Sequence, residues 1–115
     1  MLRGEIRVVD LDPVRGSEAN KRRPAVIVSN DGANATAARL HRGVITVVPV
    51  TSNVSRVYPF QVLLPADDCG LGRDSKAQAE QVRSIAVERA GRRVGQLTAS
   101  LVAELEDALR LHLGL

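Results

Sequence analysis

Short apolar segments separated by turn residues recur along most of the chain. They predict strands at residues 5–11, 25–30, 43–50, 60–64, 75–81 and 82–87. Six short strands at this spacing are typical of a small barrel or a strongly bent sheet. Two segments, 25–28 and 44–48, are apolar or β-branched throughout, which predicts strands covered on both faces at the centre of the fold.

The end of the chain has a helical period instead. Leu101, Leu105 and Leu109 recur every fourth residue with Val102 beside them, which predicts an amphipathic helix over residues 99–112. We expect its apolar stripe to pack on the sheet rather than to face a membrane or a partner.

Residues around this helix fit its start and its exposed face. Thr98 is expected to cap the N-terminus, and Leu97 and Val102 stand at the positions of a hydrophobic staple. Glu106 and Arg110 are spaced for an i, i+4 ion pair. All of these signals agree with a helix that begins near residue 99.

The sequence does not determine the secondary structure in the middle of the chain. Residues 31–40, rich in Ala, Asn and Thr, are compatible with either a short helix or an ordered loop. No internal repeat or low-complexity linker divides the 115 residues, so we expect one domain, which is long enough to bury a core.

Composition excludes several classes of protein. The single cysteine, Cys69, rules out an intramolecular disulfide, and no cysteine or histidine spacing suits zinc, so we expect no metal and a cytoplasmic protein. No charged start followed by an apolar segment suggests a signal peptide, and no apolar run approaches the roughly 20 residues that span a bilayer. We therefore expect no membrane association.

Positive charge is concentrated in the first half of the chain. Residues 1–60 contain nine Lys and Arg against five Asp and Glu, whereas residues 61–115 contain seven against eight. Fourteen of the sixteen basic residues are Arg, whose fork suits bidentate phosphate contact, although a GC-rich genome produces the same bias. Tyr58 and Phe60 are the only aromatic residues, which excludes a surface that stacks many RNA bases.

The catalytic motifs of several hydrolase classes are missing from the sequence. It contains no glycine-rich phosphate loop, no GxSxG and no HExxH. Its two histidines, His41 and His112, lie in a loop region and at the end of the predicted helix, which argues against a two-histidine acid–base pair. A hydrolase built on this chain must use Arg, Thr, Ser, Glu and Gln.

Those residue types gather at the ends of the predicted strands. They lie at 17–18 and 21–23 before one central strand, at 51–53 after the other, and at 74–75 and 81–83 beside later strands. Strand ends are where small folds often place functional sites. The alternative is structural: Arg22 and Arg23 solvate a strand entrance, Thr51 and Ser52 form a turn, and Gln81 lies on the surface.

Seven short motifs, in order along the chain, carry a resemblance to a known family. They are GEI (4–6), VDLDP (9–13), GSE (16–18), RRPAV (22–26), VPVTS (48–52), RDS (73–75) and EQVRSI (80–85). Each is common alone, but together they resemble, over about residues 3–113, the MazF/PemK family of type II toxin endoribonucleases.

This resemblance implies both a fold and an activity. The fold is mainly β (α+β), an SH3-like small β-barrel of the MazF/PemK/CcdB type with a C-terminal α-helix. The activity is that of a homodimer that cuts single-stranded RNA at short sequences without a metal or another cofactor, and so stops translation and growth.

The resemblance also assigns roles to residues in these motifs. Arg23, directly before the proline of RRPAV, and Thr51 of VPVTS match the family's catalytic pair. Residues expected to hold the RNA backbone and bases match as well: Ser17, Glu18, Ser75 and Gln81. Neighbouring residues assigned to RNA binding with them are Arg22, Ser52 and Lys76.

The assigned pair suits metal-free cleavage of RNA. When the ribose 2′-OH attacks its own 3′ phosphate, the products are a 2′,3′-cyclic phosphate and a 5′-OH, and the protein need only position the phosphate and stabilise its charge. Arg23 suits bidentate contact with the phosphate and protonation of the departing oxygen, and Thr51 suits a hydrogen bond to the same group. Because arginine is hardly ever deprotonated, Glu18 is the candidate general base.

Two residues depart from the family pattern. Arg7 stands where an aromatic residue is usual after GEI, so no packing or base-stacking role carries over there. Lys76 stands where an apolar residue is usual after RDS; it either brings a cation to the RNA channel or lies solvated at an edge. Both changes bear on which RNA is chosen, and mRNA, tRNA and rRNA all stay open.

The expected partner is a cognate antitoxin whose acidic, disordered tail competes with RNA for a basic groove containing Arg22, Arg23 and Lys76. Two other functions stay open. A related gyrase-poison branch uses the same barrel, commonly with a C-terminal Trp, whereas this chain ends LHLGL (111–115). The third reading is a catalytically inactive barrel that serves as a binding module.

Overall fold

The structure, a computed structural model, describes residues 1–13 and 15–115. Its strands are β1 (Glu5–Asp10), β2 (Arg22–Ile27), β3 (Val44–Thr51), β4 (Gln61–Leu64), β5 (Ser75–Gln78), β6 (Arg83–Ala86) and β7 (Ala90–Gln96). Its helices are α1 (Asp31–Leu40), α2 (Ala66–Cys69) and α3 (Ala99–Leu113), with the short 3-10 turns η1 (Ala79–Gln81) and η2 (Val87–Arg89).

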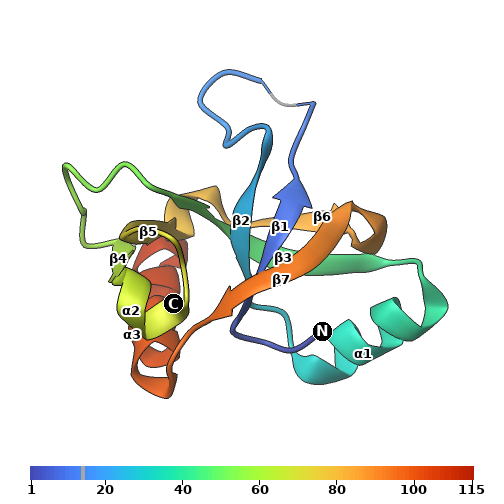
Figure 1. The fold of residues 1–115 in the computed structure, drawn as a ribbon. Helices are drawn as coiled ribbons and strands as arrows, with labels where there is room; N and C mark the ends of the chain where they lie inside the picture. Colours follow the sequence, from blue (N-terminus) through green and yellow to red (C-terminus); the bar gives the residue numbers. More distant parts are fainter. Residues whose placement is uncertain (14) are drawn as a thin grey trace.

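All strand pairs are antiparallel, in the order β4-β5-β3-β2-β1-β7. Strand β3 belongs to two parts of the sheet, because residues 44–47 pair with β6 whereas Val50 and Thr51 pair with β5. The sheet therefore bends along β3 and curls into a barrel-like fold without closing between β4 and β7, as judged on the described residues (Figure 1). The predicted mainly β barrel with a C-terminal helix is confirmed.

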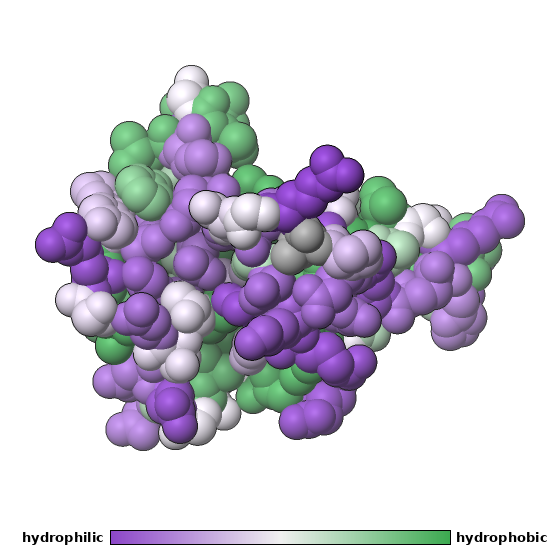
Figure 2. Space-filling model, turned by 90° about the horizontal axis from the view of Figure 1, so that it is seen from above, coloured by the Kyte–Doolittle hydropathy of each residue, from purple (hydrophilic) through white to green (hydrophobic). Residues whose placement is uncertain are grey.

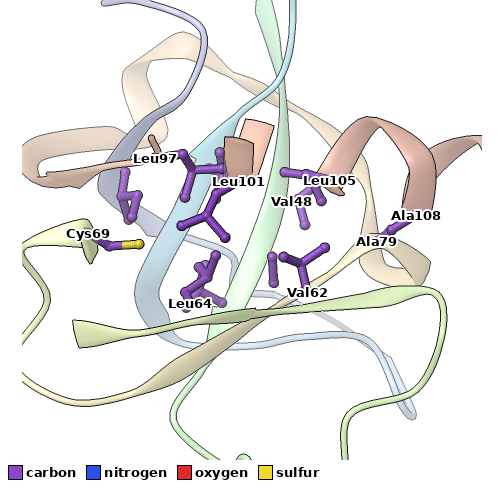
Figure 3. Packing of buried hydrophobic residues seen from close by; sticks show 13 residues of the cluster. Val48, Val62, Leu64, Cys69, Ala79, Leu97, Leu101, Leu105 and Ala108 are labelled. Carbon is purple, nitrogen blue, oxygen red and sulfur yellow. The ribbon is translucent and has the colours of Figure 1, made fainter. Parts of the chain in front are cut away.

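Apolar side chains from β2 and β3 fill cores on both faces of the sheet. Val26 and Val48 pack in a core covered by α3, together with residues of β4 and β5 (Figure 3). Ala25, Ile27 and Val47 belong to a second core on the opposite face, where Ala37 of α1 packs. This arrangement confirms the prediction that the two apolar strands are covered on both faces.

Helix α3 begins as the sequence predicts, but its ion pair differs. Thr98 Oγ1 accepts a hydrogen bond from Leu101 N at 3.3 Å, which confirms the N-cap. The predicted pair of Glu106 with Arg110 is wrong: Glu106 Oε2 instead lies 3.0 Å from Arg3 Nη1, and Arg110 bonds Asp107 at 2.9 Å. The N-terminal segment crosses close to α3 and offers Glu106 a cation that is distant in sequence.

The other differences concern the ends of elements and one missed strand. Strand β2 starts at Arg22 rather than at residue 25, and residues 79–81 form η1 instead of continuing β5. Residues 31–40, which the sequence left open as a helix or a loop, form helix α1. The side chain of its N-cap, Asn30, accepts a hydrogen bond from Ala33 N at 2.8 Å. Strand β7 was not predicted. No helix in the described part of the chain is both long and apolar enough to cross a membrane.

Candidate active site

Two prolines end the pairing between β2 and β3. The ladder pairs Ile27 with Val47 and ends at the pair of Ala25 with Pro49, and Pro24 directly precedes Ala25 in the chain. Proline has no N–H to donate to a neighbouring strand, so it interrupts a ladder. Beyond this point β3 pairs with β5, and the two strand ends separate.

A pocket of about 350 Å³ opens between the separating strand ends and the loop before β5. Its lining residues are Lys21, Arg22, Arg23, Pro24, Val50, Thr51, Ser52, Leu71, Gly72, Arg73 and Ser75. Four of them are cations, and among the described residues that line the pocket none is acidic. Figure 2 looks down on the end of the molecule from which the loop before β2 projects, and shows hydrophilic side chains gathered across it. The charge of the lining residues therefore favours binding of an anion in this pocket.

Arg23 and Thr51 approach this pocket from the two strands. The ladder between the two strands ends at Ala25 and Pro49, and Arg23 and Thr51 each lie two residues beyond that pair, on the pocket side. Each strand also continues into a buried core, so both side chains start from rigid backbone.

The Arg23 guanidinium is held from one side. Its Nε donates to Asn20 O at 2.7 Å, and its Nη2 donates to Asn20 Oδ1 at 3.1 Å. Arg22, the preceding residue, is exposed and carries no such restraint among the described contacts. The two neighbouring arginines therefore differ: one is fixed and half-buried, the other extends into solvent.

Three hydroxyl groups lie on the β3 and β5 side of the pocket. Thr51 Oγ1 accepts from Asn53 N at 3.3 Å, so its own proton stays available to a ligand. Ser52 is exposed at the rim, and Ser75 Oγ donates to Arg73 O at 3.1 Å. The structure thus brings Arg22, Arg23, Thr51, Ser52 and Ser75 together at one pocket, as the sequence predicts.

Four other predicted residues lie outside the pocket lining, and three of them meet at the loop before β2. Gln81 accepts from Ala19 N and donates to Ser17 O, both at 2.9 Å, so its side chain anchors the loop before β2. Ser17 is exposed and meets Gln81 through its carbonyl. Glu18 is also exposed, and its Oε1 accepts from Arg15 N at 2.9 Å. Ser17 and Glu18 belong to the loop that leads into Arg23, and Gln81 of η1 anchors that loop.

Comparison with known proteins identifies the family. A model described as PemK-like, MazF-like toxin of type II toxin–antitoxin system matches residues 2–113. The chain belongs to this toxin family. Endoribonuclease MazF9 of Mycobacterium tuberculosis is 68% identical over 115 residues, which cover 100% of this chain and 98% of that protein.

Solved structures of MazF proteins have the same fold as this toxin-family chain. The crystal structure of MazF from Deinococcus radiodurans superposes with a TM-score of 0.81 at 28% identity, covering 100% of this chain and 97% of that one. The MazE–MazF structure (Form-II) from the same organism gives a TM-score of 0.74 at 26% identity, covering 100% and 96%. The predicted family and fold type are thereby confirmed.

The two departures from the MazF/PemK pattern have structural partners. Arg7 Nε lies 3.1 Å from Glu5 Oε1, and Arg7 Nη1 donates to Gly91 O at 3.0 Å, so Arg7 ties β1 to β7. Lys76 is only 8% exposed, which shows that it is not a solvated edge residue. Its Nζ donates to Arg56 O at 2.6 Å and lies 6.0 Å from the Tyr58 ring, outside the pocket lining.

The predicted site residues leave out three residues of this toxin-family site. Lys21 and Arg73 line the pocket, and Asn20 holds Arg23. Both cations stand beside assigned residues, Lys21 next to RRPAV and Arg73 within RDS, so position in a motif is a signal that could have found them. The sequence gives no signal for Asn20, because its contact with the Arg23 guanidinium depends on the turn at Lys21, which appears only in the folded chain.

Proposed function

We propose that this chain is the toxin of a type II toxin–antitoxin system and cleaves single-stranded RNA as an endoribonuclease. The observation that carries the proposal is the meeting of Arg23 and Thr51 at a pocket lined by four cations. The 68% identity to Endoribonuclease MazF9 over nearly its whole length supports the same activity. The chain acts in the cytoplasm on messenger RNA, and tRNA and rRNA are the alternative substrates.

Cleavage proceeds through the substrate's own 2′-OH. This hydroxyl attacks the adjacent phosphorus in line, the bond to the 5′-oxygen breaks, and the products are a 2′,3′-cyclic phosphate and a 5′-OH. In the transition state negative charge builds up on the non-bridging oxygens, where pre-positioned donors stabilise it most. Arg23 donates hydrogen bonds to these oxygens and to the departing 5′-oxygen, which takes its proton from solvent, and Thr51 donates a hydrogen bond to the same phosphate.

The surrounding residues bind and position the RNA strand. Arg22, with Lys21 and Arg73, supplies positive potential that attracts the phosphates on either side of the cut. Ser52 and Ser75 offer hydroxyl groups along the same wall. Ser17 and Gln81 contact the RNA at the loop before β2. Lys76, on β5, contacts it beside the loop that contains Arg56.

Glu18 is the proposed acceptor of the 2′-OH proton. Its carboxylate bonds Arg15 N, so it must leave that N–H and turn toward the pocket to accept the proton. A Glu18→Gln variant tests this role, because the amide keeps the size of the side chain and removes its basicity. Cleavage by Glu18→Gln at the rate of the unmodified chain would assign the base elsewhere.

The partners follow from the same pocket. The chain forms a homodimer, and a cognate antitoxin neutralises it by laying an acidic, disordered tail over the cations that bind RNA. A related MazF forms a structure with MazE, which supports this pairing. Because RNA and the tail share one groove, cleavage should cease at saturating antitoxin; cleavage that persists there contradicts the shared groove.

The deciding experiment incubates the purified dimer with a long single-stranded RNA in EDTA and maps the new ends. Site-specific 5′-OH ends are expected. Arg23→Ala should lower the rate by about 10²–10³-fold or more, the usual cost of losing a donor to a developing oxyanion. If Arg23→Ala and Thr51→Ala cut at the unmodified rate, the catalytic assignment is wrong. No product from a verified dimer supports an inactive binding module instead.

A further inference from the structure

We infer that Asn20 is a positioning residue for Arg23. By occupying one edge of the guanidinium, Asn20 makes the opposite edge face the pocket. The inference rests on the proposed function, since it concerns how the catalytic arginine is aimed. It assigns a role to a residue that does not itself line the pocket.

The hydrogen bonds of Arg23 define which of its donors remain. A guanidinium has five N–H donors in a planar fork. Two of them, on Nε and Nη2, are directed to Asn20 O and Asn20 Oδ1. The three that remain are on Nη1 and Nη2, so Arg23 can grip a phosphate only end-on through these two nitrogens.

Asn20 is itself held in place by the loop around it. Lys21 has φ 65, a left-handed conformation that turns the chain sharply just after Asn20. Lys21 N donates to Asp12 Oδ1 at 2.9 Å, and Leu11 N donates to Lys21 O at 3.0 Å. On the other side, Gln81 Oε1 accepts from Ala19 N at 2.9 Å. A chain of contacts therefore runs from the sheet through Asn20 to the guanidinium.

The benefit of this arrangement is pre-organisation. An unrestrained arginine side chain has many rotamers, and a donor that must be ordered during the reaction stabilises the transition state less. Asn20 orders Arg23 before RNA arrives. Its absence should therefore slow the chemical step more than it weakens RNA binding.

The test compares single-turnover cleavage rates and RNA affinities of side-chain variants at position 20. Asn20→Ala removes the Oδ1 contact and keeps the backbone one, so we expect a rate lower by roughly 10-fold to 100-fold with RNA affinity within about 3-fold. Asn20→Asp keeps an acceptor for Nη2. It should restore most of the rate while its negative charge weakens RNA binding.

Asn30→Ala is the matched control, because it also removes an asparagine hydrogen bond, at the start of α1 and far along the chain from the pocket. It should lower the thermal midpoint without changing the cleavage rate. If Asn20→Ala cuts as fast as the unmodified chain, or faster because the side-on edge of Arg23 is released for phosphate, the inference is overturned.

A double-mutant cycle separates this inference from the proposed function. If Asn20 acts through Arg23, Asn20→Ala should have no further effect in an Arg23→Ala background. Equal losses in both backgrounds would show that Asn20 merely supports the loop. An Arg23→Ala variant that is fully active would instead refute the catalytic assignment, whatever Asn20 does.

Discussion

The two ends of strand β2 differ sharply within six residues. At the C-terminal end Ala25, Val26 and Ile27 are fully buried, whereas at the N-terminal end Arg22 and Arg23 border a pocket with two further cations. The buried end fixes the backbone, and the open end gathers like charges that repel one another when no anion is present. The C-terminal end of β2 thus provides a rigid backbone, and its N-terminal end carries charges that repel one another.

Ile27→Ala should show the largest difference between the two ends, because it should lower stability and leave cleavage nearly unchanged. This change removes a fully buried side chain from the core beneath α1 and should lower the free energy of unfolding by about 2–5 kcal/mol. Cleavage measured well below the new unfolding midpoint should stay near the unmodified rate, because the pocket end is untouched. Ile27→Val, costing about 0.5–1.5 kcal/mol, provides the graded control. Denaturant titration combined with single-turnover assays checks both quantities.

Thr51→Val tests the open end alone. Valine has the shape of threonine without the hydroxyl group, so the cleavage rate should fall roughly 10-fold to 100-fold while the unfolding midpoint stays nearly constant. Thr51→Ser, which keeps the donor, should stay within a few-fold of the unmodified chain. A rate that Thr51→Val leaves unchanged would remove Thr51 from the mechanism and leave it a structural residue.

A smaller effect is expected from Lys21→Gln, which removes one of the four pocket cations. The slope of log affinity for single-stranded RNA against log salt concentration should become shallower by about 0.7, the value for one phosphate contact. Glutamine is no worse suited than lysine to the positive φ at this position. Arg39→Gln, on exposed α1, is the charge-matched control and should leave the slope unchanged. Equal changes in both variants would mean that net charge, rather than the pocket, attracts RNA.

The smallest expected effect lies where β1 meets β7, away from both ends of β2. Burial opposes ionisation of Glu5, but hydrogen bonds from Leu2 N and Arg7, with the charge of Arg7, outweigh it and hold the pKa of Glu5 below its ordinary value. The resulting stability is present above the ordinary pKa of a glutamate and is lost as the pH falls through the lower, folded-state pKa.

Unfolding titrations of Glu5→Gln at several pH values check this effect. The variant should be less stable than the unmodified chain at neutral pH, and the difference should shrink in acid. Glu104→Gln, an exposed change on α3, serves as the comparison. A difference for Glu5→Gln that is constant with pH would show that its ionisation does not support the fold.

The sequence predicted the elements whose local pattern and tertiary role agree. The apolar strands around Val26 and Val48 and the helix of Leu101 and Leu105 follow from burial alone. Strand β7 (AGRRVGQ) has no such pattern, because it is a strand through pairing with β1. Its Gly95 has no room for a Cβ against the Cys69 carbonyl, a constraint that only the folded chain imposes.

The residues of the site also divide into those that the sequence could assign and those that it could not. Arg23 and Thr51 could be assigned because they lie in motifs at the ends of rigid strands. Partners distant in sequence could not: Glu106 bonds Arg3 across the fold, and Lys76 reaches the Arg56 carbonyl rather than solvent. Nothing in a linear sequence records which carbonyl a long side chain will find.

Among the described contacts, Gln81 bonds the loop before β2 through backbone atoms alone, the Ala19 N–H and the Ser17 carbonyl. Such an anchor does not depend on which side chains residues 17–19 carry. Side chains of this loop other than those of Glu18 and Asn20 can therefore change in evolution without loss of this anchor. A toxin built this way can acquire new RNA targets by small steps, each leaving a working enzyme.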